Sequence, residues 1–248
     1  MKTTVHKDKQ AMGRAAAREG AAIIREAIAR DGRAAVIVAT GASQFEMLEH
    51  LVQEDVDWNR VTAYHLDEYV GLPESHPASF RGYLKSRFVE KVADLGEFVA
   101  VDGDADDLDA EIARLNGRIA AEDIAVCFAG VGENCHLAFN DPPADFETEV
   151  PYLVVTLDEV CRQQQFGEGW FPTFEDVPAQ AVSMSVHQIL KSRNIILTIP
   201  DERKAKAVKA ALEGPVTNIA PASILQTHEA VTVHMDPAAA GLLKPHTD

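Results

Sequence analysis

Residues 124–142 read IAVCFAGVGENCHLAFNDP, an apolar run followed by a loop that carries an amide, a thiol, an imidazole and a carboxylate. The run Ile124–Ala129 predicts a buried strand, because strands covered on both faces read as continuous apolar residues. Gly130 and Gly132 indicate a sharp turn directly after this strand. The stretch therefore predicts a buried strand whose carboxyl end leads into a reactive loop.

The same apolar, β-branched pattern recurs along the chain and alternates with helical patterns. Strands are expected at Ala35–Thr40, Val61–His65, Phe98–Val101, Ile124–Ala129, Tyr152–Thr156, Ile195–Ile199 and Ala230–His234. Helices are expected at about Lys9–Arg30, Ser43–Gln53, Ser79–Val92, Asp106–Ala121 and Asp201–Glu213. This alternation indicates a parallel sheet covered by helices on both faces. We interpret residues 1–248 as a single domain with an irregular, flap-like region at about 141–180.

Composition and charge limit the possible partners. Of the 248 residues, 46% are hydrophobic and 25% charged, as in ordinary soluble domains. The net charge of −16 argues against nucleic acid or an anionic membrane as a partner, since both require clustered Lys and Arg. The sequence has no apolar run long enough to span a bilayer and no signal-peptide pattern, so we expect a cytoplasmic protein. Its three cysteines lack metal-site spacing, which favours a reduced chain without a metal.

Ligands of open parallel sheets bind at the carboxyl ends of the strands, so the residues after each expected strand were compared. After the first strand, Thr40-Gly41-Ala42-Ser43 forms a glycine turn, and Ser43 with Glu46 fits a capping box. Backbone N–H groups at such a helix start favour phosphate. A simple capped turn is the alternative.

The strand Val61–His65 is followed by adjacent carboxylates, Asp67 and Glu68. Neighbouring side chains of an extended segment point apart, so only one of the two is expected to face a ligand. A partly desolvated carboxylate beside a ligand can act as a general base. Two acids in a solvated turn are the alternative.

The loop after Ile124–Ala129 places Asn134 and His136 on the expected ligand side, and Asp141 lies close enough in sequence to hold the imidazole ring. Such a carboxylate sets the tautomer of a catalytic histidine. A zinc site is not expected, because no HxxxH or CxxC pattern accompanies His136.

The strand Ile195–Ile199 is followed by a helix start at which Asp201 is the expected N-cap. A cation in a first helical turn opposes the helix dipole, so Lys204 suggests an anionic ligand. A solvated lysine is the alternative.

Together these segments resemble the glucosamine-6-phosphate deaminase/isomerase family, from about residue 35 to 235. The most specific parts are LDEYVGL at 66–72, HP at 76–77, SF at 79–80 and GVGENCHLAFNDP at 130–142. The resemblance implies a three-layer α/β/α sandwich with a Rossmann-like, mostly parallel sheet, and it implies no metal or other cofactor. It further implies that a hexosamine 6-phosphate, most simply glucosamine 6-phosphate, is converted to fructose 6-phosphate and ammonia.

The resemblance also implies site residues. Asp67 matches the base that moves a proton between carbon 2 and carbon 1 of the opened sugar, and His136 matches the group that opens the ring. Asp141 supports His136, and Asn134 occupies a position held by Asp or Asn in the family. Substrate binding is assigned to Thr40, Gly41, Ala42, Ser43, Glu68, Gly132 and Lys204.

The chain departs from the family pattern at three places. Cys135 stands where the family usually has Gly, and Asp141 stands where it usually has Glu. The family's second phosphate-binding Arg precedes an aromatic pair, but residues 162–171 here read RQQQFGEGWF, with only Arg162 nearby.

Three other functions stay open at this point. The chain resembles equally a paralogue that acts on another sugar phosphate, whether or not ammonia is released. A 6-phosphogluconolactonase-like hydrolase fits the fold but not the carbon base that Asp67 implies. A catalytically silent sugar-phosphate sensor is the third. The assembly expected is a monomer or a homo-oligomer.

Overall fold

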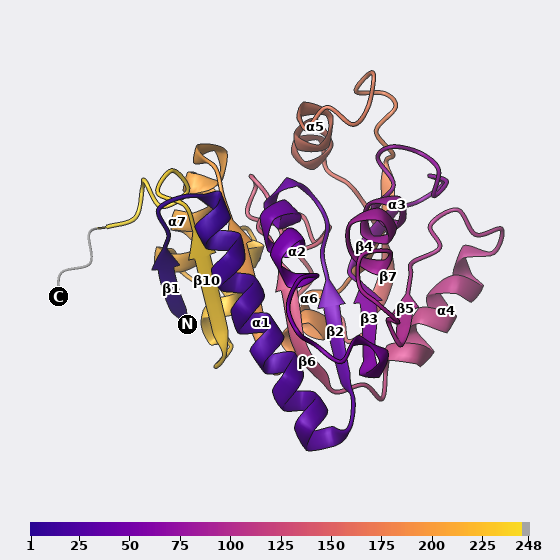
Figure 1. The fold of residues 1–248 in the computed structure, drawn as a ribbon. Helices are drawn as coiled ribbons and strands as arrows, with labels where there is room; N and C mark the ends of the chain where they lie inside the picture. Colours follow the sequence, from indigo (N-terminus) through magenta and orange to yellow (C-terminus); the bar gives the residue numbers. More distant parts are fainter. Residues whose placement is uncertain (245–248) are drawn as a thin grey trace.

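The computed structural model describes residues 1–244 of the chain (Figure 1). Its central sheet is parallel throughout and has seven strands in the order β1-β10-β9-β6-β2-β3-β5. The strands are β1 (Lys2–Val5), β2 (Ala34–Val38), β3 (Val61–His65), β5 (Glu97–Val99), β6 (Ile124–Ala129), β9 (Ile195–Ile199) and β10 (Val231–Met235).

Helices cover both faces of this sheet, as alternation along the buried strands requires. In β2, Val36 and Val38 pack in one apolar cluster with residues of α1 and α2, whereas Ala35 and Ile37 pack in another with residues of α4 and α7. The helices are α1 (Lys9–Asp31), α2 (Phe45–Leu51), α3 (Phe80–Leu84), α4 (Leu108–Ile119), α5 (Glu159–Gly167), α6 (Val186–Leu190) and α7 (Ala205–Glu213). The predicted three-layer α/β/α sandwich is confirmed.

Short single-turn helices complete the connections. The 3₁₀ segments are η1 (Ala42–Gln44), η2 (Trp58–Arg60), η4 (Glu202–Lys204) and η5 (Pro221–Thr227), and α3 continues as a π-helix, η3 (Lys85–Val89). Within residues 1–244, no helix has the length and apolar character needed to cross a lipid bilayer.

One predicted strand belongs to a different sheet. Residues Tyr152–Thr156 form β7, but this strand pairs antiparallel with β8 (Gln180–Met184), which in turn pairs with β4 (Asp67–Tyr69). Burial alternates along β7, so only one of its faces is covered, as is common in antiparallel sheets. The prediction of β7 was correct in position and wrong in its sheet.

The sequence prediction also missed several short elements. It read the N-terminal residues as the approach to a helix, whereas Lys2–Val5 forms the edge strand β1, paired with β10. Strands β4 and β8 and helices α5 and α6 were not predicted, and β7 and α5 lie within the region predicted to be an irregular flap. These elements are too short for their hydrophobic period to be read reliably.

Helix α1 is well specified by its ends and was predicted to within one residue. Asp8 accepts a hydrogen bond from the Ala11 amide at 2.7 Å, and Gly32 ends the helix in the left-handed conformation. Near its start, α1 crosses α2 closely. A Cβ on Gly13 would lie 2.5 Å from the backbone carbonyl carbon of Glu46.

This close crossing predicts opposite effects for two glycine substitutions. We expect Gly13→Ala to lower the free energy of unfolding by about 1–3 kcal/mol, because backbone atoms of α2 must move. The matched control is Gly117→Ala in α4, where a Cβ meets nothing within 4 Å and should add roughly 0.5–1 kcal/mol through helix propensity. Urea unfolding of both variants measures the two changes, and a Gly13→Ala variant as stable as the parent would contradict the close contact.

Candidate active site

A cavity lies at the carboxyl ends of the central strands, where the sequence predicted a ligand. Among the predicted site residues, its lining includes Thr40, Gly41, Ala42, Ser43, Asp67, Gly132, His136 and Lys204. Three others, Glu68, Asn134 and Asp141, do not line it. Helix α5 lies beyond this end of the sheet (Figure 1) and contributes further lining residues.

The turn after β2 is held in place by a buried glutamine. The Gln44 side chain donates to Ser43 Oγ at 3.1 Å and to Thr198 Oγ1 at 2.9 Å, and Thr198 Oγ1 donates to the Ser43 carbonyl at 2.9 Å. Gly41 has a φ of 91°, which favours glycine. The predicted capping box is wrong, because no side chain caps η1 or α2.

Asp67 is a buried carboxylate that lines the cavity. Its Oδ1 is shielded from solvent and has no hydrogen-bond partner among residues 1–244. Desolvation, with a smaller contribution from the negative charge of Glu68, raises the pKa of Asp67 to about 8. A carboxyl group with such a pKa can accept and return a proton near neutral pH.

Glu68 has a different role from the one predicted. Its carboxylate is completely buried and accepts hydrogen bonds from Ser79 Oγ at 2.9 Å and from the amides of Phe80 at 3.1 Å and Arg81 at 2.7 Å. The assignment of Glu68 to substrate binding is therefore wrong. Every oxygen of a buried carboxylate needs donors, and here the start of α3 supplies them. The expectation that only one of the two acids faces the ligand is met by Asp67.

His136 is held by the carboxylate that the sequence predicted. Its Nδ1 lies 2.9 Å from Asp141 Oδ1, and Asn134 Nδ2 donates to the same oxygen at 3.0 Å. Although desolvation acts to raise the pKa of Asp141, the hydrogen bond and charge of His136 and the hydrogen bond from Asn134 outweigh it and lower the pKa. An ionised Asp141 assigns the ring proton to Nδ1 and leaves Nε2 free.

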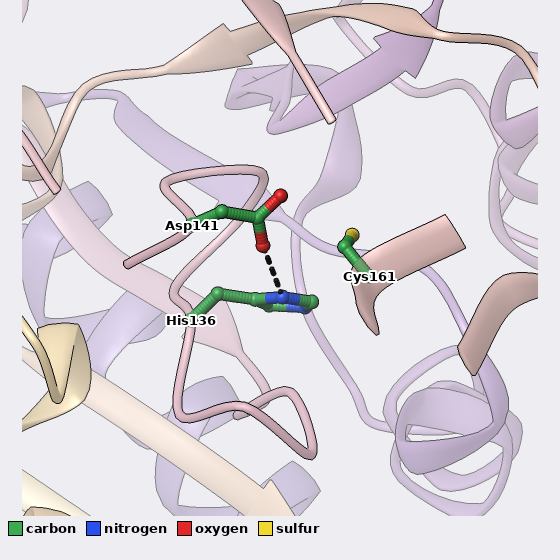
Figure 2. Close-up of side chains that lie close together, drawn as sticks. All are labelled: His136, Asp141 and Cys161. Atoms are coloured by element: carbon green, nitrogen blue, oxygen red, sulfur yellow. Dashed lines mark hydrogen bonds and ion pairs between the residues drawn. The ribbon is translucent and has the colours of Figure 1, made fainter. Parts of the chain in front are cut away.

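Gly132 gives this ring its space. A Cβ at residue 132 would lie 2.3 Å from His136 Nε2. Asn134 thus acts on His136 through Asp141 and does not line the cavity. Cys161 of α5 lies beside the His136–Asp141 pair (Figure 2).

Lys204 enters the cavity from η4, at the start of α7. Asp201 accepts a hydrogen bond from the Arg203 amide at 3.4 Å, so the predicted N-cap is confirmed. Burial lowers the pKa of Lys204, and the negative charges of Glu168 and Glu133 act in the opposite direction. A buried ammonium group without a close ion pair is a strong donor for an anion.

The cavity also contains residues that the sequence reading missed, namely Lys9, Gln164, Gln165, Glu168 and Arg203. Lys9 occupies the first turn of α1, so the signal that marked Lys204, a cation at a helix start, would have marked Lys9 as well. The other positions gave no comparable signal, because α5 was not predicted.

Two departures from the family pattern have structural explanations. Cys135 adopts a φ of 72°, and its thiol points away from the cavity toward the Ala207 carbonyl at 3.6 Å. Arg162 donates to the carbonyls of Phe174 and Val177 and does not line the cavity. Arg162 therefore does not replace the second phosphate-binding arginine.

The two site carboxylates should affect stability with opposite sign. Because folding raises the pKa of Asp67 from 3.8 to about 8, the folded state keeps a proton that the unfolded chain loses, and Asp67 destabilises the fold increasingly between these values. We expect the Tm of Asp67→Asn to exceed the parental Tm by a margin that grows from about pH 4 to about pH 8.

Asp141→Asn is the matched control. Since the pKa of Asp141 is lowered, its charge stabilises the fold above the unfolded pKa, and this contribution is lost as the pH falls through the folded value. We expect a reduced Tm at neutral pH and a narrowing difference below about pH 4. Calorimetry across this range checks both variants, and a parallel pH dependence for the two would contradict the assignments.

Comparison with known proteins agrees with this geometry. A family model described as glucosamine-6-phosphate isomerases/6-phosphogluconolactonase matches residues 7–234. A glucosamine-6-phosphate deaminase of Oenococcus oeni is 35% identical over 228 residues, covering 92% of this chain and 94% of that protein. A glucosamine-6-phosphate deaminase of Lacticaseibacillus paracasei is 38% identical over 206 residues, covering 83% of this chain and 85% of that protein.

Solved structures show the same fold. A monomeric glucosamine-6-phosphate deaminase superimposes with a TM-score of 0.88 at 32% identity and covers 98% of this chain and 100% of that one. A 6-phosphogluconolactonase from Trypanosoma cruzi gives a TM-score of 0.79 at 14% identity, covering 98% and 97%, a likeness of fold alone. The chain thus belongs to the glucosamine-6-phosphate isomerase/6-phosphogluconolactonase family.

Proposed function

We propose that the protein is a glucosamine-6-phosphate deaminase, which converts glucosamine 6-phosphate and water to fructose 6-phosphate and ammonia. The observation that carries this proposal is Asp67 Oδ1, a buried carboxylate oxygen without a hydrogen-bond partner among the described residues, in the cavity that His136 also lines. The similarity to deaminases at 35% identity supports the same substrate.

The two side chains divide the proton transfers. With its Nδ1 proton bound to Asp141, His136 accepts the proton of the anomeric hydroxyl at Nε2 and passes it to the ring oxygen, which opens the sugar. Asp67 then removes the proton from carbon 2 and returns it to carbon 1. The carbon–nitrogen double bond so formed at carbon 2 is hydrolysed by water, and ammonia leaves.

The phosphate group of the substrate is assigned to the other end of the cavity. Lys204 lies there with Lys9 and Arg203, and the Thr40–Ser43 turn lies across from them in the lining. First-turn amides such as those of η1 lack acceptors within their helix and can donate to phosphate oxygens. These groups supply local positive charge in a chain whose net charge is −16.

A lactonase is less compatible with the site. Lactone hydrolysis requires an activated water, whereas the dry environment of Asp67 suits the removal of a carbon-bound proton. The lactonases among the solved structures are 14–19% identical to this chain and share its fold. We place the reaction in the cytoplasm, in keeping with the three free, buried cysteines of the chain.

The central test is Asp67→Asn. The amide keeps the shape of the side chain but cannot accept a proton from carbon, so kcat for ammonia and fructose 6-phosphate formation should fall ~10²–10⁴-fold while substrate binding persists. Asp109→Asn, an exposed acid of α4, is the control and should retain full activity. Near-normal turnover by Asp67→Asn, or parental activity confined to 6-phosphogluconolactone, would refute the proposal.

The phosphate assignment has its own test. Lys204→Gln removes a charge-assisted hydrogen bond worth roughly 1.5–3 kcal/mol, so KM for glucosamine 6-phosphate should rise about 10–100-fold with a smaller change in kcat. Lys206→Gln changes the same charge on the exposed side of α7 and should leave KM unaltered. Equal effects of both substitutions would point to general electrostatics and against a phosphate contact at Lys204.

A further inference from the structure

Three side chains of different chemistry meet behind the cavity. One ligand-type atom from each of His136, Asp141 and Cys161 lies within 4.8 Å of the others. Figure 2 shows His136 and Asp141 on one loop and Cys161 beside them on a separate element, α5. His136 and Cys161 are buried, with 7% and 1% of their surface exposed. The spacing argument against a metal did not detect this group, because Cys161 is distant in sequence.

The donor set suits a borderline-soft cation. Imidazole nitrogen, thiolate sulfur and carboxylate oxygen are the ligands that zinc uses in proteins, and three protein ligands leave one position of a tetrahedron open. With Zn–N and Zn–O distances near 2.1 Å and Zn–S near 2.3 Å, tetrahedral ligand atoms lie roughly 3.3–3.8 Å apart. The observed group needs to contract by about 1 Å at most to reach this geometry.

We propose that His136, Asp141 and Cys161 bind a thiophilic divalent cation of the zinc and cadmium class, and that this ion reversibly inhibits the enzyme. The ion is an inhibitor and not a resident cofactor, since the catalytic roles assigned above need no metal. The inhibition part of the proposal rests on the proposed function, whereas the binding part does not.

Inhibition follows from the position of protons on the imidazole ring. Nδ1 faces Asp141 at 2.9 Å, so this nitrogen is the one that meets the ion. When Nδ1 binds the ion, the ring proton moves to Nε2, and the Cys161 thiol releases its proton to solvent. Nε2 then carries a hydrogen and can no longer accept the proton of the anomeric hydroxyl.

The ion can reach this group through the substrate cavity. His136 lines the cavity, and so do Gln164 and Gln165 of the helix that carries Cys161. The other two cysteines are separate from the group, because Cys127 lies in strand β6 and the Cys135 thiol is directed at the Ala207 carbonyl. A single cysteine should therefore account for the metal response.

Direct binding is measured first, with Cd²⁺ as the probe and without substrate. Cadmium–thiolate bonds absorb in the near ultraviolet, so we expect the parent protein to develop this band at a stoichiometry of about one ion per chain. Cys161→Ser and Cys161→Ala should both lose the band, with thermal unfolding used to show that each is folded. The matched control, Cys135→Gly, removes a thiol of the neighbouring loop at a backbone position that glycine adopts freely and should keep the band.

Inhibition is measured second, with Zn²⁺ in a buffer free of phosphate. Turnover of the parent and of Cys135→Gly should fall with added Zn²⁺ and recover when a chelator is added. Losing one of three protein ligands should raise the Zn²⁺ concentration for half-inhibition of Cys161→Ser at least about tenfold, relative to the activity of that variant without metal.

The results separate the two proposals. Absence of the cadmium band in the parent, its persistence in both Cys161 variants, or equal zinc sensitivity of the parent and Cys161→Ser would overturn the metal site. A protein that shows the band and loses it in the Cys161 variants, yet does not release ammonia from glucosamine 6-phosphate, would refute the proposed function and leave the binding site in place.

Discussion

The active site depends on the parallel register of β2, β6 and β9. Val38 lies opposite Phe128, and Phe128 lies opposite Ile196, so all three strands end at the same edge of the sheet. The glycine turn, the histidine loop and the start of η4 must therefore converge. The turns after β2 and β6 are so close that a Cβ on Gly130 would lie 2.6 Å from Ser43 Oγ.

Within this frame, two adjacent buried acids have opposite environments. Strand β4 pairs with β8 and turns Glu68 toward the start of α3, which supplies its oxygens with donors. The same alternation turns Asp67 into the cavity, where Oδ1 has no partner among the described residues. One acid thus stabilises the local fold, and the other reduces the stability of the fold in exchange for a raised pKa.

Local sequence was sufficient for features that depend on a strand and the residues just after it. Asp67, His136 with Asp141, and Lys204 were found because each follows a readable apolar strand, and α1 was found through its caps and long period. The role of Glu68 was missed because it depends on α3, whose start is more than ten residues away. The cavity residues of α5 and the approach of Cys161 were missed because tertiary packing alone brings them there.

Helix α5 gives the site a division of labour between segments of the chain. Asp67 and His136, the proposed proton-transfer groups, follow strands of the two sheets, whereas Gln164, Gln165 and Glu168 reach the same cavity from a short surface-side helix and its C-cap. Gln165 accepts a hydrogen bond from Tyr69 at 2.7 Å, and Gln164 accepts one from the Glu133 amide at 2.8 Å. Selection can thus modify substrate preference in one segment of the gene while the segments that encode the reaction chemistry are inherited unchanged.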